Sequence, residues 1–353
     1  MKVGIITPAN LWNCPYVDIY RRVLDKGNVQ YDVITWCRDG NDEDGCIQFK
    51  FQSPLTNPFL KFISYFSFAA FLKKTIKENK YDKLIVFTPQ VGIFISSFLK
   101  KYYKGKYIFD YRDLSIERKW YFKKSFLRLL DNSFANVISS PGFKRCLPQR
   151  DYLLSHNFDA NAVKDAIGKR NENKFGAEDK IDVLTIGGIR DYSSNVQVLD
   201  ALANDTQFTV RFVGKGVASN LLEDYSKRKQ ILNTSFVGFY RKPEEAEFVR
   251  NTTFMNIFYP RVITHDTAVS NRFYNSLIYR KPMIVTKDTT QGDFAEKYNV
   301  GVALHNCHNL ADELKSFMQQ DYNAYAERCD KLLLEFLEDQ ARFEEMVREF
   351  TKS

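Results

Sequence analysis

Short runs of β-branched and aromatic residues alternate with longer helix-like segments along this chain of 353 residues. The alternation is typical of βα units, in which strands joined by helices line up in a parallel sheet. With 44% apolar and 27% charged side chains, the chain can bury a sizeable core in water, which excludes collagen, disordered and small disulfide-rich proteins. We therefore predict an α/β fold.

The first half contains one complete series of such units. Its predicted strands are Val3–Thr7, Tyr31–Trp36, Lys83–Phe87, Tyr107–Asp110 and Asn136–Ser139. The helices predicted between them are Val17–Leu24, Phe59–Glu78, Val91–Tyr103 and Lys119–Leu130. This series predicts one parallel sheet covered by helices.

The apolar periodicity lapses over Lys164–Lys180, where Lys, Asn, Glu and Gly dominate. A second series of predicted strands follows, at Asp182–Ile186, Thr209–Val213, Thr234–Val237, Phe254–Phe258, Pro282–Val285 and Val302–Leu304. Residues 330–350 predict a charged amphipathic helix. We predict a first domain over residues 1–165, a linker over 166–180, a second domain over 181–335 and a final helix over 336–353 that packs back toward the first domain.

Each series of alternating strands and helices predicts one Rossmann-like domain. We expect the two domains to face each other across a cleft. Ligands of doubly wound sheets bind outside the carboxyl ends of the strands. The order of elements therefore predicts a small ligand in the cleft, without indicating the chemistry.

Charge is distributed unevenly along the chain. Residues 1–160 carry 25 Lys and Arg against 15 Asp and Glu, whereas residues 161–353 carry 26 against 28. A basic first half predicts an anionic partner, either a phosphate-bearing substrate or a negatively charged membrane surface. We expect no nucleic acid partner, because no recognition motif accompanies the positive charge.

The cysteines and the apolar stretches bear on the compartment. The six cysteines form no Cys-x-x-Cys pair, and residues 1–12 contain no long apolar stretch of the kind that directs export. The longest apolar stretches, residues 62–72 and 84–99, are too short or too interrupted to span a membrane. We expect a cytoplasmic protein.

The strongest local signal is Ser270–Val285, which predicts a loop, a short amphipathic helix and a buried strand. The free amides of a helix start, together with the guanidinium of Arg272, suit an anion. In the alternative interpretation, Ser270 only caps the helix and Arg272 is solvated.

The run Asn271–Leu277, followed by Arg280–Val285, resembles the donor-binding segment of family 4-like glycosyltransferases with the GT-B fold. That segment typically has Asn-Lys, two aromatic or aliphatic residues and Glu-Tyr, and then Gly-Lys-Pro-Val-Ile. Other segments are similar to motifs of that family in the same order, namely Tyr107–Leu114, Phe134–Gly142, Leu153–Asp159, Leu184–Arg190, Phe212–Gly216 and Phe236–Tyr240. Each motif is weak alone, so the argument is their common order over nearly the whole chain.

The resemblance implies that the second domain binds a nucleoside diphosphate sugar and the first binds the acceptor. It implies that Gly187 and Gly188 let backbone approach the donor phosphates, and that Arg190 neutralises a diphosphate oxygen. Further implied donor-binding residues are Lys215, Gly238, Phe239 and Tyr240 near the nucleoside, Ser270, Asn271 and Arg272 at the diphosphate, and Asn275 at the ribose.

Two departures from the family pattern concern acidic residues. The family has two Glu eight residues apart, and this chain has Thr267 and Asn275 there. An amide accepts hydrogen bonds from a ribose more weakly than a carboxylate does. A divergent enzyme and an inactive one would share these departures, but Arg190, Lys215 and Arg272 preserve the cations that a departing diphosphate needs. We therefore expect activity.

Sugar transfer requires stabilisation of an oxocarbenium-like centre and of a departing diphosphate. The resemblance implies retention of the anomeric configuration and no cofactor or metal, the cations and the helix dipole taking the metal's place. If the reaction inverts instead, Asp113 is the best-placed general base; otherwise it pairs with Arg112 or Arg118 or caps a helix.

Histidines offer two further candidates. His265 could contact the transferred sugar or its phosphate as a catalytic residue, or it could be an ordinary polar loop residue. His305, Cys307 and His308 lack a fourth ligand at a recognisable spacing, so we predict no metal site.

Lysines and aromatic residues are interleaved in Phe59–Lys80, Phe98–Lys106 and Arg118–Arg128. This pattern fits helices that lie on a membrane, with aromatic rings among the head groups and cations facing anionic lipid. In the alternative, the aromatic rings fill the core and the lysines face water. We predict peripheral contact with the cytoplasmic face of the membrane.

These observations lead to one functional prediction. We expect a hexosyltransferase whose donor is a nucleoside diphosphate sugar, with a UDP-sugar as the first choice. Its expected acceptor is a glycan carried on a lipid, in bacterial capsular, O-antigen or exopolysaccharide synthesis. One alternative is a non-catalytic GT-B subunit that binds sugar nucleotide or lipid and supports a partner transferase, which the two missing Glu favour. The other is a UDP-sugar 2-epimerase.

Overall fold

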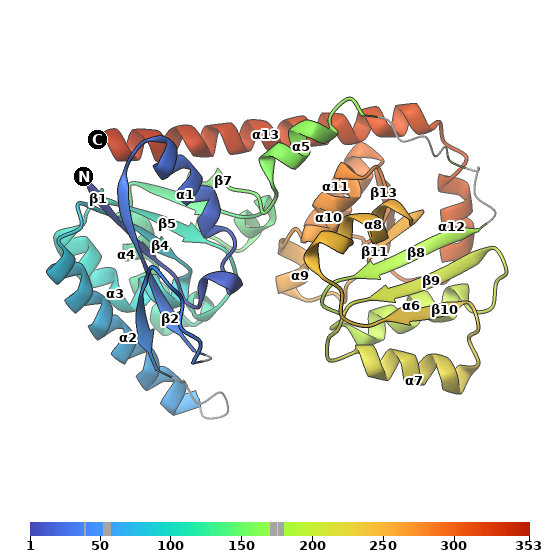
Figure 1. Ribbon diagram of the computed structural model, residues 1–353, viewed down its shortest axis with the longest axis horizontal. Coiled ribbons are helices and arrows are strands. Elements are labelled where there is room, and N and C mark those ends of the chain that lie inside the picture. Colours follow the sequence, from blue (N-terminus) through green and yellow to red (C-terminus); the bar gives the residue numbers. More distant parts are fainter. Residues whose placement is uncertain (39, 52–57, 170–174, 176–179) are drawn as a thin grey trace. The chain divides into compact units, whose positions relative to one another are not determined.

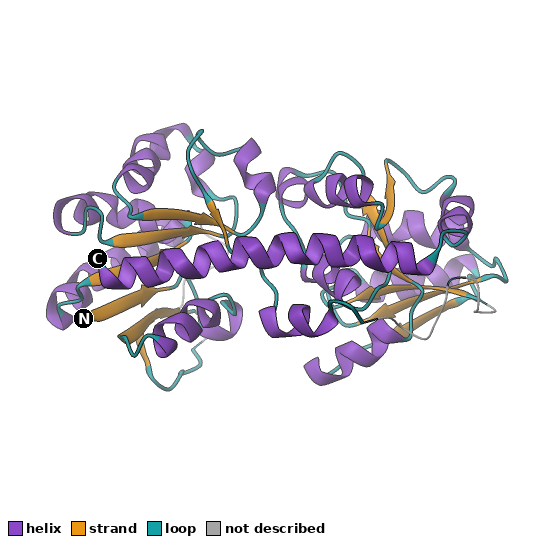
Figure 2. Cartoon of the chain, turned by 90° about the horizontal axis from the view of Figure 1, so that it is seen from above, coloured by secondary structure: helices purple, strands orange, loops and turns teal. Residues whose placement is uncertain are grey.

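The computed structural model describes residues 1–38, 40–51, 58–169, 175 and 180–353. The chain forms two compact units, one of Met1–His156 with Asp339–Ser353 and the other of Asn157–Glu338 (Figure 1). Most of the predicted linker, residues 166–180, lies outside the described residues. Each unit is an α/β layer structure in which strands lie between helices (Figures 1 and 2).

The first unit is built on a seven-stranded parallel sheet with the order β3-β2-β1-β4-β5-β6-β7. Its strands are β1 (Lys2–Ile6), β2 (Gln30–Cys37), β3 (Cys46–Lys50), β4 (Lys83–Phe87), β5 (Tyr107–Tyr111), β6 (Ala135–Ile138) and β7 (Leu153–Leu154). Its helices are α1 (Val17–Lys26), α2 (Pro58–Asn79), α3 (Pro89–Tyr102), α4 (Lys123–Asp131) and the last part of α13 (Tyr322–Lys352). Short 3₁₀ turns η1 (Leu11–Asn13), η2 (Ile116–Arg118), η3 (Trp120–Phe122) and η4 (Pro141–Arg145) complete the unit.

Both faces of this sheet are buried, which explains why its central strands are continuously apolar. Leu84 and Val86 of β4 face the core beneath α2, α3 and α4. Ile85 and Phe87 face the opposite core, which α1 and the end of α13 complete. The end of α13 contributes Phe343, Met346, Val347 and Phe350 to that second core, so the last helical turns of the chain are part of the first unit.

The second unit has a six-stranded parallel sheet with the order β10-β9-β8-β11-β12-β13. Its strands are β8 (Ile181–Ile186), β9 (Phe208–Val213), β10 (Thr234–Val237), β11 (Phe254–Ile257), β12 (Met283–Thr286) and β13 (Gly301–Leu304). Its other elements are α5 (Ala160–Ala166), α6 (Tyr192–Leu202), α7 (Ser219–Lys229), η5 (Lys242–Glu244), α8 (Glu245–Arg250), α9 (Ile263–Thr267), α10 (Asn271–Ile278), α11 (Thr290–Tyr298), α12 (Leu310–Phe317) and the first part of α13.

The direction of strand addition reverses between β8 and β11 in this second sheet. The connections that leave the two strands therefore pass to opposite faces, and a crevice opens outside their carboxyl ends. This topological switch point is where a doubly wound sheet binds its ligand.

The predicted α/β class with two Rossmann-like domains is confirmed, and every predicted strand is present with its ends displaced by no more than one residue. Two strands were missed. Residues 46–50 form a half-exposed edge strand without a clear apolar signal, and β7 has only two residues. The predicted helix Lys119–Leu130 was wrong at its start, because Trp120–Phe122 form a 3₁₀ turn before α4 begins at Lys123.

Two glycine turns in the second unit pack backbone against backbone. Gly214, after β9, has a φ of 125°, and a Cβ atom there would lie 2.1 Å from the carbonyl oxygen of Gly187, after β8. No side chain fits at this distance, and L-residues rarely adopt this backbone conformation. The Gly187 turn therefore depends on a glycine at position 214.

We predict that Gly214→Ala destabilises the protein by at least about 3 kcal/mol, since an unfavourable φ adds to a backbone clash. Gly168→Ala is the matched control, because Gly168 also has a positive φ, 77°, but no described atom lies within 4 Å of the added Cβ. Its cost is expected to be only about 1 kcal/mol. Urea denaturation followed by far-UV circular dichroism measures both, and equal losses would contradict the packing role of Gly214.

Candidate functional site

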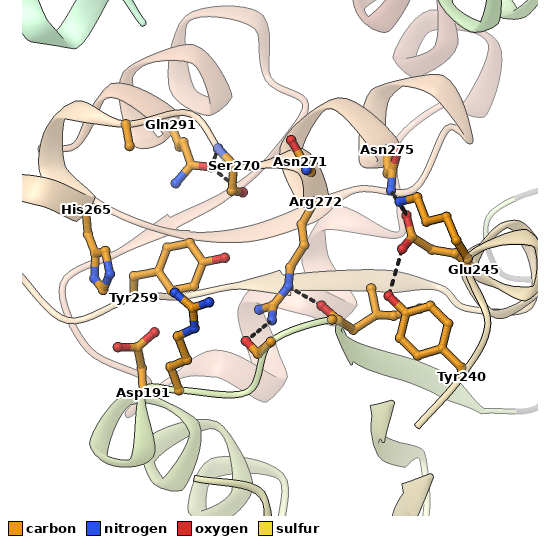
Figure 3. A pocket seen from close by; sticks show the side chains of 16 residues that line it. Asp191, Tyr240, Glu245, Tyr259, His265, Ser270, Asn271, Arg272, Asn275 and Gln291 are labelled. Carbon is orange, nitrogen blue, oxygen red and sulfur yellow. Dashed lines mark hydrogen bonds and ion pairs between the residues drawn. The ribbon is translucent and has the colours of Figure 1, made fainter. Parts of the chain in front are cut away.

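A cavity of about 480 Å³ lies at the switch point of the second sheet. Its wall is formed by the loop after β8, the segments that follow β10 and β11, the first turn of α10, and α11 (Figure 3). The lining residues are Ile186, Gly187, Gly188, Arg190, Asp191, Tyr240, Lys242, Glu245, Tyr259, His265, Ala268, Ser270, Asn271, Arg272, Asn275 and Gln291. All of these lining residues belong to the second unit.

Arg272, in the first turn of α10, ties together the ends of β8 and β11. Its Nε donates a hydrogen bond to the carbonyl oxygen of Ile186 at 2.5 Å, Nη2 donates to that of Gly188 at 3.0 Å, and Nη1 donates to that of Asn256 at 3.4 Å. Its guanidinium also lies 5.7 Å from the centre of the Tyr259 ring. Figure 3 shows the side chain running from the helix down to the loop. Arg272 therefore holds the Gly187–Gly188 turn in place, and its guanidinium donates hydrogen bonds to backbone carbonyl oxygens.

The first turn of α10 leaves backbone donors free. Ser270 precedes the helix, and both its amide and its hydroxyl donate to Oε1 of the buried Gln291, at 3.0 and 2.8 Å. In the described part of the chain no acceptor faces the amides of Asn271 and Arg272. Two unpaired amides at the positive end of a helix dipole form a site for an anion.

Arg190 is the cation available to such an anion. Its side chain is exposed, lines the cavity and forms no ion pair among the described residues. The Arg190 Nε lies 3.4 Å from the position that a Cβ of Gly188 would occupy, so the guanidinium folds over the glycine turn. A bound diphosphate can meet Arg190 without any existing ion pair being broken.

Glu245, the first residue of α8, is the best-connected carboxylate in the cavity wall. It accepts hydrogen bonds from the Tyr240 hydroxyl at 2.7 Å, the Lys242 ammonium at 2.6 Å and the Asn275 side-chain amide at 2.8 Å (Figure 3). Burial disfavours its charged form, but the bonds from Lys242 and Tyr240 outweigh burial and hold the pKa of Glu245 below its usual value. Glu245 is therefore a fixed anion at neutral pH.

His265 lies in α9 at the other end of the cavity, with its ring centre 5.0 Å from that of Tyr259. Its Nδ1 is buried and has no hydrogen-bond partner among the described residues. The side chain can therefore still donate or accept a hydrogen bond within the cavity wall. No group of three or more His, Cys, Asp and Glu in the described residues could hold a metal ion.

The structure brings together most of the residues that the sequence analysis singled out. Nine of them line the cavity, namely Gly187, Gly188, Arg190, Tyr240, His265, Ser270, Asn271, Arg272 and Asn275. Lys215, Gly238 and Phe239 are exposed and lie outside its wall, while Asp113 is exposed in the first unit. Arg112, one of the partners expected for Asp113, forms an ion pair with the buried Asp110 at 2.6 Å.

Thr267, at one of the two positions where the resemblance expects Glu, is buried and donates to the carbonyl oxygen of Ile263 within α9. It does not line the cavity.

Sequence reasoning missed four cavity residues that matter for its chemistry: Lys242, Glu245, Tyr259 and Gln291. Tyr259 could have been found, because it follows a predicted strand at the edge where ligands bind. Gln291 and Glu245 had no signal, since their role depends on contacts with Ser270, 21 residues away, and Asn275, 30 residues away.

No protein-family profile matches the chain. No curated protein matches it in sequence. Solved structures do match it in fold. A trehalose-6-phosphate synthase, studied for glycosyl transfer with retention, is 7% identical with a TM-score of 0.71, over 100% of this chain and 99% of that one.

Two other structures agree. Anabaena HepE in complex with UDP is 14% identical with a TM-score of 0.68, over 99% of this chain and 100% of that one. WaaG, a glycosyltransferase involved in lipopolysaccharide biosynthesis, is 10% identical with a TM-score of 0.64, over 98% of this chain and 99% of that one. Together with the two parallel sheets, these likenesses show that the chain has the GT-B fold.

We predict that Arg272→Ala lowers the free energy of unfolding by about 2 kcal/mol, because three carbonyl oxygens lose a charged donor. Arg190→Ala is expected to change it by less than about 0.5 kcal/mol, since the side chain is exposed and unpaired among the described residues. Denaturant titration of the two ligand-free variants makes the comparison. Equal stability of both would show that Arg272 does not hold the loop.

Proposed function

We propose that the protein transfers a hexose from a nucleoside diphosphate sugar, in the first instance a UDP-sugar, to a glycan acceptor. The observation that carries the proposal is the anion site at the switch point, where the free amides of Asn271 and Arg272 lie in one cavity with the unpaired guanidinium of Arg190. The rest of the wall offers two tyrosine rings, amides, two carboxylates and a histidine, which suit hydroxyl-rich groups.

The fold neighbours support the donor class. HepE was crystallised with UDP and with UDP and glucose, and the trehalose-6-phosphate synthase was studied for transfer with retention. WaaG acts in lipopolysaccharide biosynthesis, which favours a surface polysaccharide as the product of this chain as well. We therefore extend the proposal to retention of the anomeric configuration and to bacterial capsular, O-antigen or exopolysaccharide synthesis.

In the proposed mechanism, negative charge that develops on the departing diphosphate is stabilised by the amides of Asn271 and Arg272 and by the guanidinium of Arg190. The two amides are fixed by α10 before the reaction, so they need no reorganisation when the bond from the anomeric carbon to the phosphate oxygen breaks. Arg272 acts by positioning the Gly187–Gly188 turn. The free Nδ1 of His265 would contact a sugar hydroxyl. The proposal requires no metal and no other cofactor.

We propose that the acceptor is carried on a lipid, because one face of the first unit combines exposed aromatic rings with cations. Trp120 is 84% exposed and contacts Tyr121, which contacts Phe122, and Phe122 contacts Phe62 of α2. Beside Trp120, a groove of about 570 Å³ is lined by Lys100, Lys123, Lys124 and Arg128. We call these residues the aromatic–basic face. None of the helices in the described part of the chain is long and apolar enough to cross a bilayer.

A non-catalytic role as a partner subunit is the second candidate. It is favoured by Thr267, which stands where the resemblance expects a Glu, lies outside the cavity wall and donates its hydroxyl hydrogen bond within α9. Release of nucleoside diphosphate from a UDP-sugar distinguishes the two, because only the enzyme turns over. Repeating the assay with EDTA tests metal independence, and the anomeric proton of the product in NMR reports retention or inversion.

We predict that one of UDP, GDP, CDP, ADP and dTDP raises the Tm by several degrees in a thermal-shift panel. A ligand at a hundred times its dissociation constant adds about 2.7 kcal/mol to the native state. Arg190→Ala should reduce the shift because the anion loses its cation. Arg228→Ala removes an equally exposed arginine outside the cavity and should leave the shift unchanged. No shift with any nucleotide would rule out the donor site.

We predict that the protein co-sediments with vesicles containing 30% anionic lipid and that 0.5 M salt releases it. Changing Lys123 and Lys124 to Gln should weaken binding about tenfold or more, since each lysine near such a surface contributes about 1 kcal/mol. Changing Lys227 and Lys229, exposed on α7 of the second unit, to Gln is the matched control. Equal weakening in both pairs would disprove docking through the aromatic–basic face.

A further inference from the structure

Position 275 lacks the carboxylate that the resemblance leads one to expect, yet the structure places a carboxylate beside it. The side-chain amide of Asn275 donates to Oε1 of Glu245 at 2.8 Å. Asn275 lies on α10 and Glu245 on α8, so two elements meet to form this pair. An acidic group is therefore present at this end of the cavity, supplied from a different part of the chain.

Glu245 and Asn275 both have oxygen lone pairs that accept no hydrogen bond from the described residues. A carboxylate offers about four lone-pair positions. On Glu245, Oε1 accepts from Asn275 and Lys242, whereas Oε2 accepts only from Tyr240. Among the described residues, no donor reaches the side-chain oxygen of Asn275. One open position on a carboxylate oxygen and one free amide oxygen thus lie on two side chains that are hydrogen-bonded to each other.

The Glu245 carboxylate has one firmly held donor, Tyr240, and one weakly held donor, Lys242. The Glu245 side chain is 14% exposed, and burial beside a carboxylate raises the pKa of Tyr240, so its hydroxyl remains a donor at neutral pH. The Lys242 side chain is 77% exposed. An ion pair with so exposed a partner is weak. Tyr240 and Asn275 therefore hold the carboxylate in place whether or not Lys242 stays bound, and an incoming hydroxyl group can reach the open position on Oε2.

Glu245 and Asn275 also stand at a boundary between two cavities. Both line the 480 Å³ cavity with the anion site and a second cavity of about 360 Å³. The second is lined in part by the aromatic residues Phe158, Tyr274 and Tyr279. In a nucleoside diphosphate the ribose lies between the base and the diphosphate, so its diol would face this boundary when the diphosphate occupies the anion site.

We propose that Glu245 and Asn275 together bind the 2′,3′-diol of the nucleotide ribose, one hydroxyl donating to Glu245 Oε2 and the other to Asn275 Oδ1. The inference rests on the proposed function, because it takes the ligand to be a nucleoside diphosphate. It assigns Glu245 as a specificity-determining residue that selects ribonucleotides over 2′-deoxyribonucleotides. Loss of either hydroxyl leaves a charged or amide acceptor without its donor.

The experiment compares binding of UDP, GDP, CDP and ADP with binding of their 2′-deoxy counterparts by isothermal titration calorimetry. For the nucleotide that binds, the wild-type protein should prefer the ribose form by about 10- to 100-fold, as expected for a hydrogen bond to a charged group. In Glu245→Gln the preference should fall to about threefold or less, mainly through weaker binding of the ribose form.

Glu244→Gln is the matched control, because this neighbouring glutamate pairs with Arg241 and lies outside the walls of both cavities. It should retain the wild-type preference. Glu245→Asp keeps the charge and withdraws the carboxylate by one methylene, so it should also lose the preference. It serves as the second variant if Glu245→Gln does not fold.

The outcomes separate the two proposals. If the wild-type protein binds a nucleoside diphosphate but Glu245→Gln and Glu245→Asp keep the full preference for ribose, the role of Glu245 is disproved and the donor site stands. An equal loss in Glu244→Gln would also disprove it, since the effect would then follow charge alone. If the wild-type protein binds no nucleoside diphosphate, both the inference and the proposed function fail.

Discussion

The candidate site depends on one side chain that satisfies the backbone where the second sheet changes direction. At this switch point the loops after β8 and β11 diverge, and backbone carbonyl oxygens near the ends of the two strands need donors from elsewhere in the fold. Arg272 reaches these oxygens from α10 and bonds to Ile186, Gly188 and Asn256. The same contacts set the position of the glycine turn relative to the helix start. The anion site is thus a consequence of how the sheet's open end is closed.

That arrangement divides the positive charge of the site between two tasks. Arg272 is held by backbone oxygens and shapes the cavity, whereas Arg190 is exposed and free to meet a ligand. Of the two carboxylates in the wall, that of Glu245 is held by Tyr240, Lys242 and Asn275. The proposed sugar nucleotide has an anionic part for Arg190 and hydroxyl groups for the carboxylate and amide acceptors of the wall.

Much of the fold could be predicted because its signals are local. The central strands of both sheets are buried on both faces, so they appear in the sequence as short apolar runs such as Lys83–Phe87, and turn residues separate them from the helices. Prediction failed where this signal is weak. The edge strand Cys46–Lys50 is only half-buried, and the 3₁₀ turn Trp120–Phe122 runs directly into α4 with no Gly or Pro to mark the boundary.

The sequence by itself determined the α/β class, the two series of strands and the segments that meet at the carboxyl edge of the second sheet, because strand order along the chain and apolar patterning are local properties. Tertiary structure alone decided what those segments do. It assigned Arg272 to the backbone and Arg190 to the cavity, although the two residues are of one type, and it left Lys215 and Phe239 outside the wall. It also placed Glu245 beside Asn275, 30 residues away. The physical reason is that a hydrogen bond depends on distances of about 3 Å between groups on separate elements, and these distances exist only once the helices have packed on the sheet.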